Sequence, residues 1–143
     1  MSVSRVLSLR LTDEQMDRLQ RVGRRLGRST SEAAARLLEE ALRQREFVFI
    51  EFRDSPVGRQ AYLQGTRLAV WQVVSVARAY GDDSAKTAAH LELPTIQVAA
   101  TLRYAAAYPE EIEAASADSA WTVAHLDLII PGLEVVDSDA PPA

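Results

Sequence analysis

Few side chains in this sequence have the types and spacing that catalysis requires. The chain has no cysteine and only two histidines, His90 and His125, which are far apart in the sequence. It contains no nucleophile–base pair, no glycine-rich phosphate loop and no acidic cluster with the spacing of metal ligands. The acids Glu110, Glu111 and Glu113 are better explained by the dipole at a helix N-terminus. The sequence therefore predicts a protein that is not an enzyme and holds no metal or cofactor.

The best candidates for binding residues lie near the N-terminus, where leucines alternate with other side chains. The pattern at residues 6–11 predicts a short strand with three leucines on one side and three other side chains on the opposite side: Val6, Ser8 and Arg10. A strand needs a neighbour for its backbone hydrogen bonds, and this segment supplies none. We therefore expect a homodimer in which two copies form an antiparallel ribbon and bury their leucines together.

Two amphipathic helices are expected to follow this strand. The first is predicted over residues 13–26, with Thr12 and Gln15 as a capping box and Gly27 as its left-handed end. The second opens at residues 29–32, where Ser-Thr-Ser-Glu is a second capping box. Backbone N–H groups and the helix dipole favour an anion at such a terminus. A segment of about forty residues is too small to fold alone, which again indicates a dimer.

The order of strand, helix, Gly-Arg-Ser turn and capped helix resembles the ribbon-helix-helix family of DNA-binding repressors and antitoxins, over roughly residues 4–46. In that family the dimeric ribbon enters the major groove and three outward residues touch base edges. The resemblance assigns this role to Val6, Ser8 and Arg10. Arginine can fork onto guanine and serine can pair either way, whereas the valine offers only a thymine-methyl contact. The resemblance assigns phosphate contacts to the start of the second helix, at Arg28, Ser29, Thr30 and Ser31.

The charge of the chain is unevenly distributed. Residues 1–46 contain ten arginines and seven acidic residues, a net charge of +3, whereas residues 47–143 contain six basic and thirteen acidic residues, a net charge of −7. A basic head on an acidic body indicates two different partners. No apolar stretch approaches the roughly eighteen residues of a membrane span, and the N-terminus lacks the core of a signal peptide. We therefore expect a cytoplasmic protein with no membrane partner.

The remaining chain is expected to form a hairpin and several helices. The predicted strands are Phe47–Arg53 and Gln60–Leu63, joined by a turn at Asp54–Gly58. The predicted helices are Leu68–Tyr80, Ser84–Leu91 and Pro94–Tyr108, with a short fourth from Pro109. The predicted fold class is thus mainly α with short β. Its domains are a ribbon-helix-helix unit at residues 1–46, a helix-turn-helix-like domain at 47–116 and an extended tail at 117–143.

A second resemblance covers about residues 47–115. It is carried by Gly65-Thr66-Arg67-Leu68-Ala69-Val70-Trp71, the pattern of three helices and the ending Tyr108-Pro109-Glu110-Glu111-Ile112. These features are similar to a small domain of unknown function that recurs in prokaryotic antitoxins of the VapB type. Its members often lie beside a PIN-like ribonuclease toxin. The two resemblances together imply an antitoxin of a type II system that binds operator DNA, represses its own operon and neutralises such a toxin.

Apolar residues of the tail are the candidates for the toxin contact: Trp121, Leu126, Leu128, Ile129 and Ile130. After Arg103 the chain has no lysine or arginine, and only His125 could become a cation. The tail therefore cannot neutralise the acidic metal site of a nuclease through an ion pair, and apolar docking is the expected route. The same residues would also fit a final strand of the domain, although they exceed what a small core needs.

Three alternatives stay open at the level of sequence. The chain could be a stand-alone dimeric transcription regulator that senses a small molecule in its helical domain, or a structural dimerisation adaptor. The predicted third helix could also read a second DNA groove through Thr95, Gln97, Thr101 and Arg103. Its single basic residue and acidic surroundings favour packing or protein binding for that helix.

Overall fold

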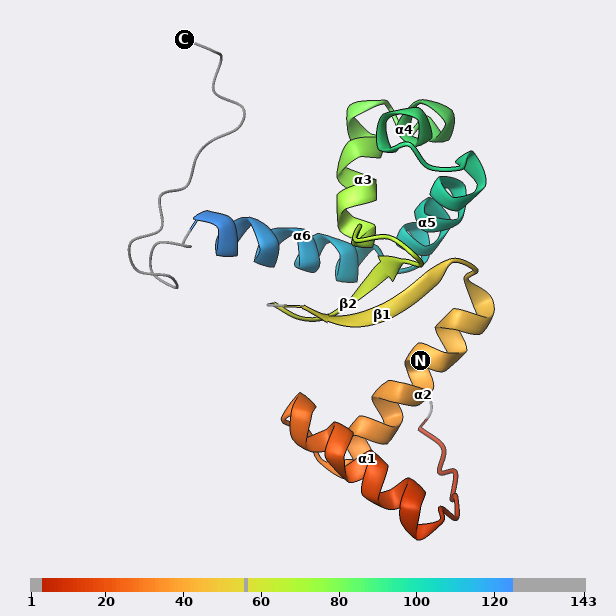
Figure 1. The fold of residues 1–143 in the computed structure, drawn as a ribbon, viewed down its shortest axis with the longest axis vertical. Helices are drawn as coiled ribbons and strands as arrows, with labels where there is room; N and C mark the ends of the chain where they lie inside the picture. The colour runs from red at the N-terminus through yellow and green to blue at the C-terminus, as the bar shows by residue number, and fades with distance from the viewer. Residues whose placement is uncertain (1–3, 56, 125–143) are drawn as a thin grey trace. The chain divides into compact units, whose positions relative to one another are not determined.

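The computed structural model describes residues 4–55 and 57–124 (Figure 1). This part of the chain contains six helices and a two-stranded antiparallel sheet, which confirms the predicted class of mainly α with short β. The chain divides into two compact units, Met1–Arg43 and Gln44–Ala143. None of the helices in the described ranges is long and apolar enough to span a bilayer.

Helix α1 (Asp13–Leu26) begins and ends where the sequence predicts. The Thr12 hydroxyl accepts a hydrogen bond from the Gln15 N–H at 3.2 Å, and the Gln15 side chain accepts one from the Thr12 N–H at 3.0 Å. Gly27 ends the helix with φ = 63°, a conformation that costs glycine little because it has no Cβ. These local contacts confirm the predicted capping box and the left-handed C-cap.

Helix α2 (Thr30–Glu46) packs closely against the end of α1 because Gly23 has no side chain. A Cβ at this position would lie 3.0 Å from the Arg28 carbonyl oxygen and 3.6 Å from the Cβ of the buried Ala33. The Arg28 N–H donates to the Gly23 carbonyl at 2.9 Å across the same turn. Gly23 and Gly27 together therefore determine where the first turn of α2 lies against α1.

The N-terminal segment differs from its prediction. Residues 4–12 form neither helix nor strand, so the strand expected at residues 6–11 is absent from the single chain. The leucines of this segment are exposed, and Leu9 exposes 72% of its surface. An isolated strand cannot satisfy its backbone groups by itself, and the prediction assigned its partner to a second copy. The ribbon formed by the strands of two copies therefore remains a prediction.

The predicted hairpin of the second unit is confirmed, but its strands have different bounds. Strand β1 (Ile50–Ser55) pairs with β2 (Gly58–Leu63) in a register that runs from Ile50 opposite Leu63 to Ser55 opposite Gly58. The first strand begins later than predicted because Phe47 is buried in the core and Phe49 has a positive φ of 66°. The loop is shorter than predicted, since the Ser55 hydroxyl donates to the Gly58 carbonyl at 2.6 Å.

Three helices follow the hairpin at the predicted places: α3 (Val70–Ala79), α4 (Ser84–Leu91) and α5 (Thr95–Ala107). The N-cap of α4 is Asp83 rather than Ser84, because the Asp83 carboxylate accepts a hydrogen bond from the Lys86 N–H at 2.9 Å. Small apolar side chains hold these helices together, and Val73, Ala88 and Val98 form their common buried cluster.

Helix α6 (Pro109–Ala124) corrects the predicted tail. The extended conformation expected from residue 117 is wrong for residues 117–124, which continue the helix. This stretch has no apolar stripe, but its alanines have the highest intrinsic helix propensity. The Arg78 side chain on α3 pairs with Glu113 on α6, and this carboxylate raises the pKa of the guanidinium. The rest of the predicted tail, residues 125–143, lies outside the described residues.

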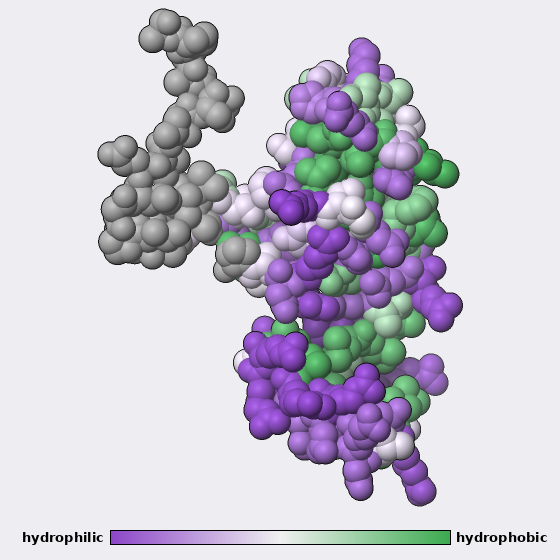
Figure 2. Space-filling model, viewed as in Figure 1, coloured by the Kyte–Doolittle hydropathy of each residue, from purple (hydrophilic) through white to green (hydrophobic). Residues whose placement is uncertain are grey.

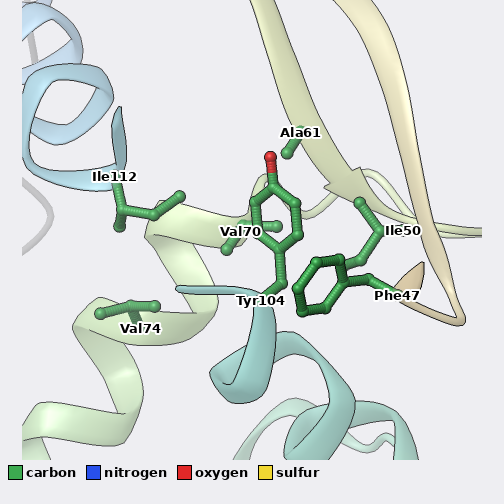
Figure 3. Packing of buried hydrophobic residues seen from close by; sticks show 7 residues of the cluster. All are labelled: Phe47, Ile50, Ala61, Val70, Val74, Tyr104 and Ile112. Carbon is green, nitrogen blue, oxygen red and sulfur yellow. The ribbon is translucent and has the colours of Figure 1, made fainter. Parts of the chain in front are cut away.

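The main core of the second unit surrounds Tyr104 of α5 (Figure 3). Its buried members come from the hairpin, from α3, α5 and α6, and from the turn before β1: Phe47, Ile50, Ala61, Val70, Val74, Tyr104 and Ile112. The Tyr104 ring is fully buried and meets the Phe47 ring edge-on, with 5.2 Å between ring centroids. Its hydroxyl donates to Glu111 Oε2 at 2.7 Å, which ties α5 to the first turn of α6.

The motif Gly65-Thr66-Arg67 forms the turn that leads into α3. Gly65 has φ = 76°, and the Thr66 hydroxyl donates to the Leu63 carbonyl at 2.8 Å and accepts from the Leu68 N–H at 3.0 Å. Arg53 on β1 donates to the Thr66 carbonyl at 2.7 Å. Arg67 is exposed and makes no ion pair within the described ranges. The motif is therefore explained by the geometry of the turn.

Candidate nucleic-acid interface

The predicted phosphate anchor lies at the first turn of α2. The Ser29 hydroxyl accepts a hydrogen bond from the Glu32 N–H at 3.2 Å and donates one to Glu32 Oε1 at 3.0 Å. Arg28 Nη1 lies 3.4 Å from Glu32 Oε2. The hydrogen bond from Ser29 and the guanidinium of Arg28 lower the pKa of the Glu32 carboxyl below its ordinary value. The predicted cap at Ser29 is therefore present, with Glu32 as its charged partner.

This arrangement leaves two backbone donors for an external anion. The N–H groups of Thr30 and Ser31 have no acceptor within the part of the chain that the structure describes. Such donors at a helix N-terminus favour a phosphate. Glu32 occupies the same turn with a negative charge, so a phosphate would have to draw Arg28 away from it. Both side chains are more than half exposed, which makes this exchange inexpensive.

The three residues predicted to touch bases are all exposed. Val6 exposes 96% of its surface, and Ser8 and Arg10 are exposed as well. Within the described ranges no hydrogen bond or ion pair joins them to the first turn of α2. In the single chain, the residues predicted to touch bases are therefore not joined to the predicted phosphate anchor at the start of α2. This is expected if a second copy is needed to order the N-terminal segment.

The first unit leaves several large apolar side chains exposed, and Figure 2 shows hydrophobic surface on it beside hydrophilic surface. The exposed residues are Val6, Leu7, Leu9, Leu11, Met16, Leu38 and Leu42. They come from the N-terminal segment and from both helices. Exposed apolar residues in this number over a short segment are typical of a surface that another protein covers.

The second unit carries the one predicted toxin contact that the structure describes. Trp121 lies on α6 and exposes 57% of its surface. The other predicted contacts lie outside the described residues: Leu126, Leu128, Ile129 and Ile130. Thr101 of α5 is fully buried and its hydroxyl donates to the Gln97 carbonyl at 2.8 Å, so this side chain cannot read a DNA groove. In residues 4–55 and 57–124 no three acidic or histidine side chains are grouped to hold a metal ion.

Helix α1 also carries four exposed arginines that are not among the residues predicted from the sequence to bind DNA. They are Arg18, Arg21, Arg24 and Arg25, and none of them has an acidic partner among the residues described. Their spacing of three and four residues was the signal that they share a face. Only the structure shows that the acids nearby in the sequence leave them unpaired.

The chain was compared with protein-family models, with curated proteins and with solved structures, and none of them matches it.

Proposed function

We propose that the protein is a dimeric antitoxin that binds operator DNA to repress its own operon and neutralises a PIN-like ribonuclease toxin. The observation that carries the DNA-binding part is the row of exposed, alternating residues immediately before the capped helix α1. The apolar members of this row have no cover in the single chain, and the other members include a serine and an arginine. The toxin-binding part is supported by the acidic second unit and by exposed Trp121 on α6.

A ribbon formed by two copies accounts for both sets of residues. Pairing the N-terminal segments would satisfy their backbone groups and bury the leucines against the apolar faces of α1 and α2. Each buried leucine contributes about 1.5–3 kcal/mol, so six leucines from two copies offset much of the conformational entropy that is lost when the two short segments are ordered. Period-two alternation then leaves Val6, Ser8 and Arg10 of both copies on the outer face. A two-stranded ribbon of this kind fits the major groove of B-DNA.

Replacing Arg10 by Ala is expected to weaken operator binding by about 1–3 kcal/mol and to relax base preference, because an arginine that forks onto guanine reads sequence. Arg28→Ala should weaken binding to all sequences alike, since its contact is with phosphate. Fluorescence anisotropy with the operator and with a shuffled duplex measures both effects. Arg45→Ala, at the other end of α2, is the matched control. An unchanged ratio of affinities for the two duplexes in Arg10→Ala would show that Arg10 reads no base.

The toxin contact is tested by replacing Trp121 with Ala. If the indole fills a pocket on the toxin, its loss should weaken the complex by about 2 kcal/mol or more while leaving operator binding unchanged. Val48→Ala is the control, because Val48 is equally exposed in the same unit. The partner is the product of the neighbouring reading frame, and calorimetry measures the affinity.

A second variant separates the two parts of the predicted toxin-binding region. Deletion of residues 125–143 keeps α6 whole, whereas truncation after Ser116 would remove half of that helix. Loss of toxin binding in the deletion alone would assign the contact to those residues and not to Trp121. If the toxin binds the Trp121→Ala variant and the deletion variant with the affinity of the parent chain, the proposed toxin contact is wrong.

A further inference from the structure

The α1 arginines occupy one side of the helix. At 3.6 residues per turn, Arg18, Arg21 and Arg25 project within a sector of roughly 60°, and Arg24 lies beside them. The apolar stripe of α1, which contains Leu19, Val22 and Leu26, is partly buried and is centred roughly 100° around the helix from these three arginines. All four arginines are exposed. We call these four residues the arginine face.

The arginine face makes no ion pair within the described residues, although acids are close in the sequence. Elsewhere in the first unit, Arg28, Arg36 and Arg43 each pair with a glutamate four residues away. Glu14 and Asp17 lie four residues before Arg18 and Arg21, yet no ion pair forms there. Within the described residues no ion pair neutralises these four positive charges, although Glu14 and Asp17 project from the same side of the helix and reduce its net charge to +2.

The helix dipole accounts for only part of this pattern. Arg24 and Arg25 lie in the last turn of α1, where positive charge stabilises the helix. Arg18 and Arg21 lie in the middle of the helix, where the dipole has little effect. With Arg25 they form a row of positive charge along the helix that the dipole does not explain.

The spacing of the arginines matches an extended polyanion. With a rise of about 1.5 Å per residue, the distance along the helix axis from Arg18 to Arg25 is roughly 10 Å. A DNA strand carries a phosphate about every 3.4 Å along its axis, so this length covers about three phosphates. The face includes no large apolar or aromatic side chain of the kind that forms the centre of protein interfaces. Charge and composition thus favour nucleic acid over an acidic protein.

We propose that the arginine face of α1 binds backbone phosphates of DNA that flanks the site read by the ribbon. This inference rests on the proposed function. It adds a contact that strengthens binding to any sequence, whereas Ser8 and Arg10 distinguish one sequence from another. The Gly27 turn joins the arginine face to the start of α2, where the N–H groups of Thr30 and Ser31 have no acceptor within the described residues.

The test compares two triple variants of the full chain that lose the same positive charge. One replaces Arg18, Arg21 and Arg25 with Gln, and the other replaces Arg67, Arg78 and Lys86 of the second unit with Gln. Glutamine is a good helix former, so α1 is expected to persist, and circular dichroism checks this. The affinity for an operator duplex with long flanks is measured over a range of salt concentrations. A duplex trimmed to the operator and an unrelated duplex of equal length are measured in parallel.

The first variant should reduce the slope of log K against log[salt] on the long duplex by about 2.7, that is, about 0.9 for each of three phosphate contacts. The control variant should keep the slope of the parent chain. The ratio of operator to unrelated affinity should not change in either variant, and trimming the flanks should reduce the difference between the variants. A slope equal to that of the control, or loss of toxin binding with the DNA slope intact, would overturn the inference. The latter result would assign the face to an acidic protein.

The same measurements separate this inference from the function on which it rests. If the parent chain binds operator and unrelated DNA equally, but the first variant still loses its slope, the arginine face binds DNA and sequence-specific repression is wrong. If the parent chain discriminates between the duplexes while the first variant keeps its slope, the proposed function stands and the arginine face plays no part in DNA binding.

Discussion

Leu9→Asp is expected to prevent formation of the proposed dimer. In the proposed ribbon, Leu9 of each copy is buried in a shared core, so the variant would place two carboxylates in an apolar environment. Burying an unpaired charge costs several kcal/mol, which is comparable to the total stability of many small domains. Sedimentation velocity should show a monomer, and operator binding should be lost together with the dimer.

Ser8→Asp is the matched control for this experiment. It adds the same charge to the same segment, but on the face that the ribbon directs to solvent, so the dimer should persist. DNA binding by this variant should still weaken, because a carboxylate would face the phosphates. A stable Leu9→Asp dimer, or equal dissociation of both variants, would show that period-two alternation does not organise this segment.

Tyr104→Ala is expected to destabilise the second unit by about 3–5 kcal/mol, the range for removing a buried aromatic ring. Tyr104 is fully buried, and its ring contacts Phe47, Phe52 and Tyr108, with centroid distances of 5.2, 6.3 and 4.9 Å. Because these residues come from separate segments of the unit, the cavity would weaken the packing of all of them. Figure 3 shows the rings of Tyr104 and Phe47 side by side. The free energy of unfolding, measured with urea, gives the effect.

Two further variants serve as controls for Tyr104→Ala: one keeps the Tyr104 ring, and the other removes a more exposed tyrosine. Tyr104→Phe keeps the ring and removes only the hydrogen bond to Glu111, so its cost should be smaller, about 1.5–3 kcal/mol. Tyr80→Ala removes a tyrosine that is more than a third exposed and should cost less than Tyr104→Ala. If Tyr80→Ala and Tyr104→Ala were equally stable, Tyr104 would not be the centre of the core.

The sequence by itself determined those features that depend on near neighbours in the chain. The capping box of Thr12 and Gln15, the left-handed end at Gly27 and the C-terminal end of α4 all depend on contacts between residues a few positions apart. The mainly helical fold class and the hairpin follow from periodicity and turn chemistry, which are also local. The candidate residues at the start of α2 could be predicted from the sequence because they too depend on near neighbours in the chain.

Tertiary structure decided the features that depend on distant residues. Phe47 leaves the predicted strand because it packs against Tyr104, far away in the sequence. Helix α6 continues to Ala124 without an apolar stripe, since its first turns are anchored to the core through Ile112 and Glu111. Among the described residues the arginines of α1 form no ion pair although glutamate and aspartate lie at helical spacing, because side-chain geometry and not spacing decides whether an ion pair forms. Residues 4–12 form no strand alone, since a strand takes its hydrogen bonds from a neighbour that local sequence cannot supply.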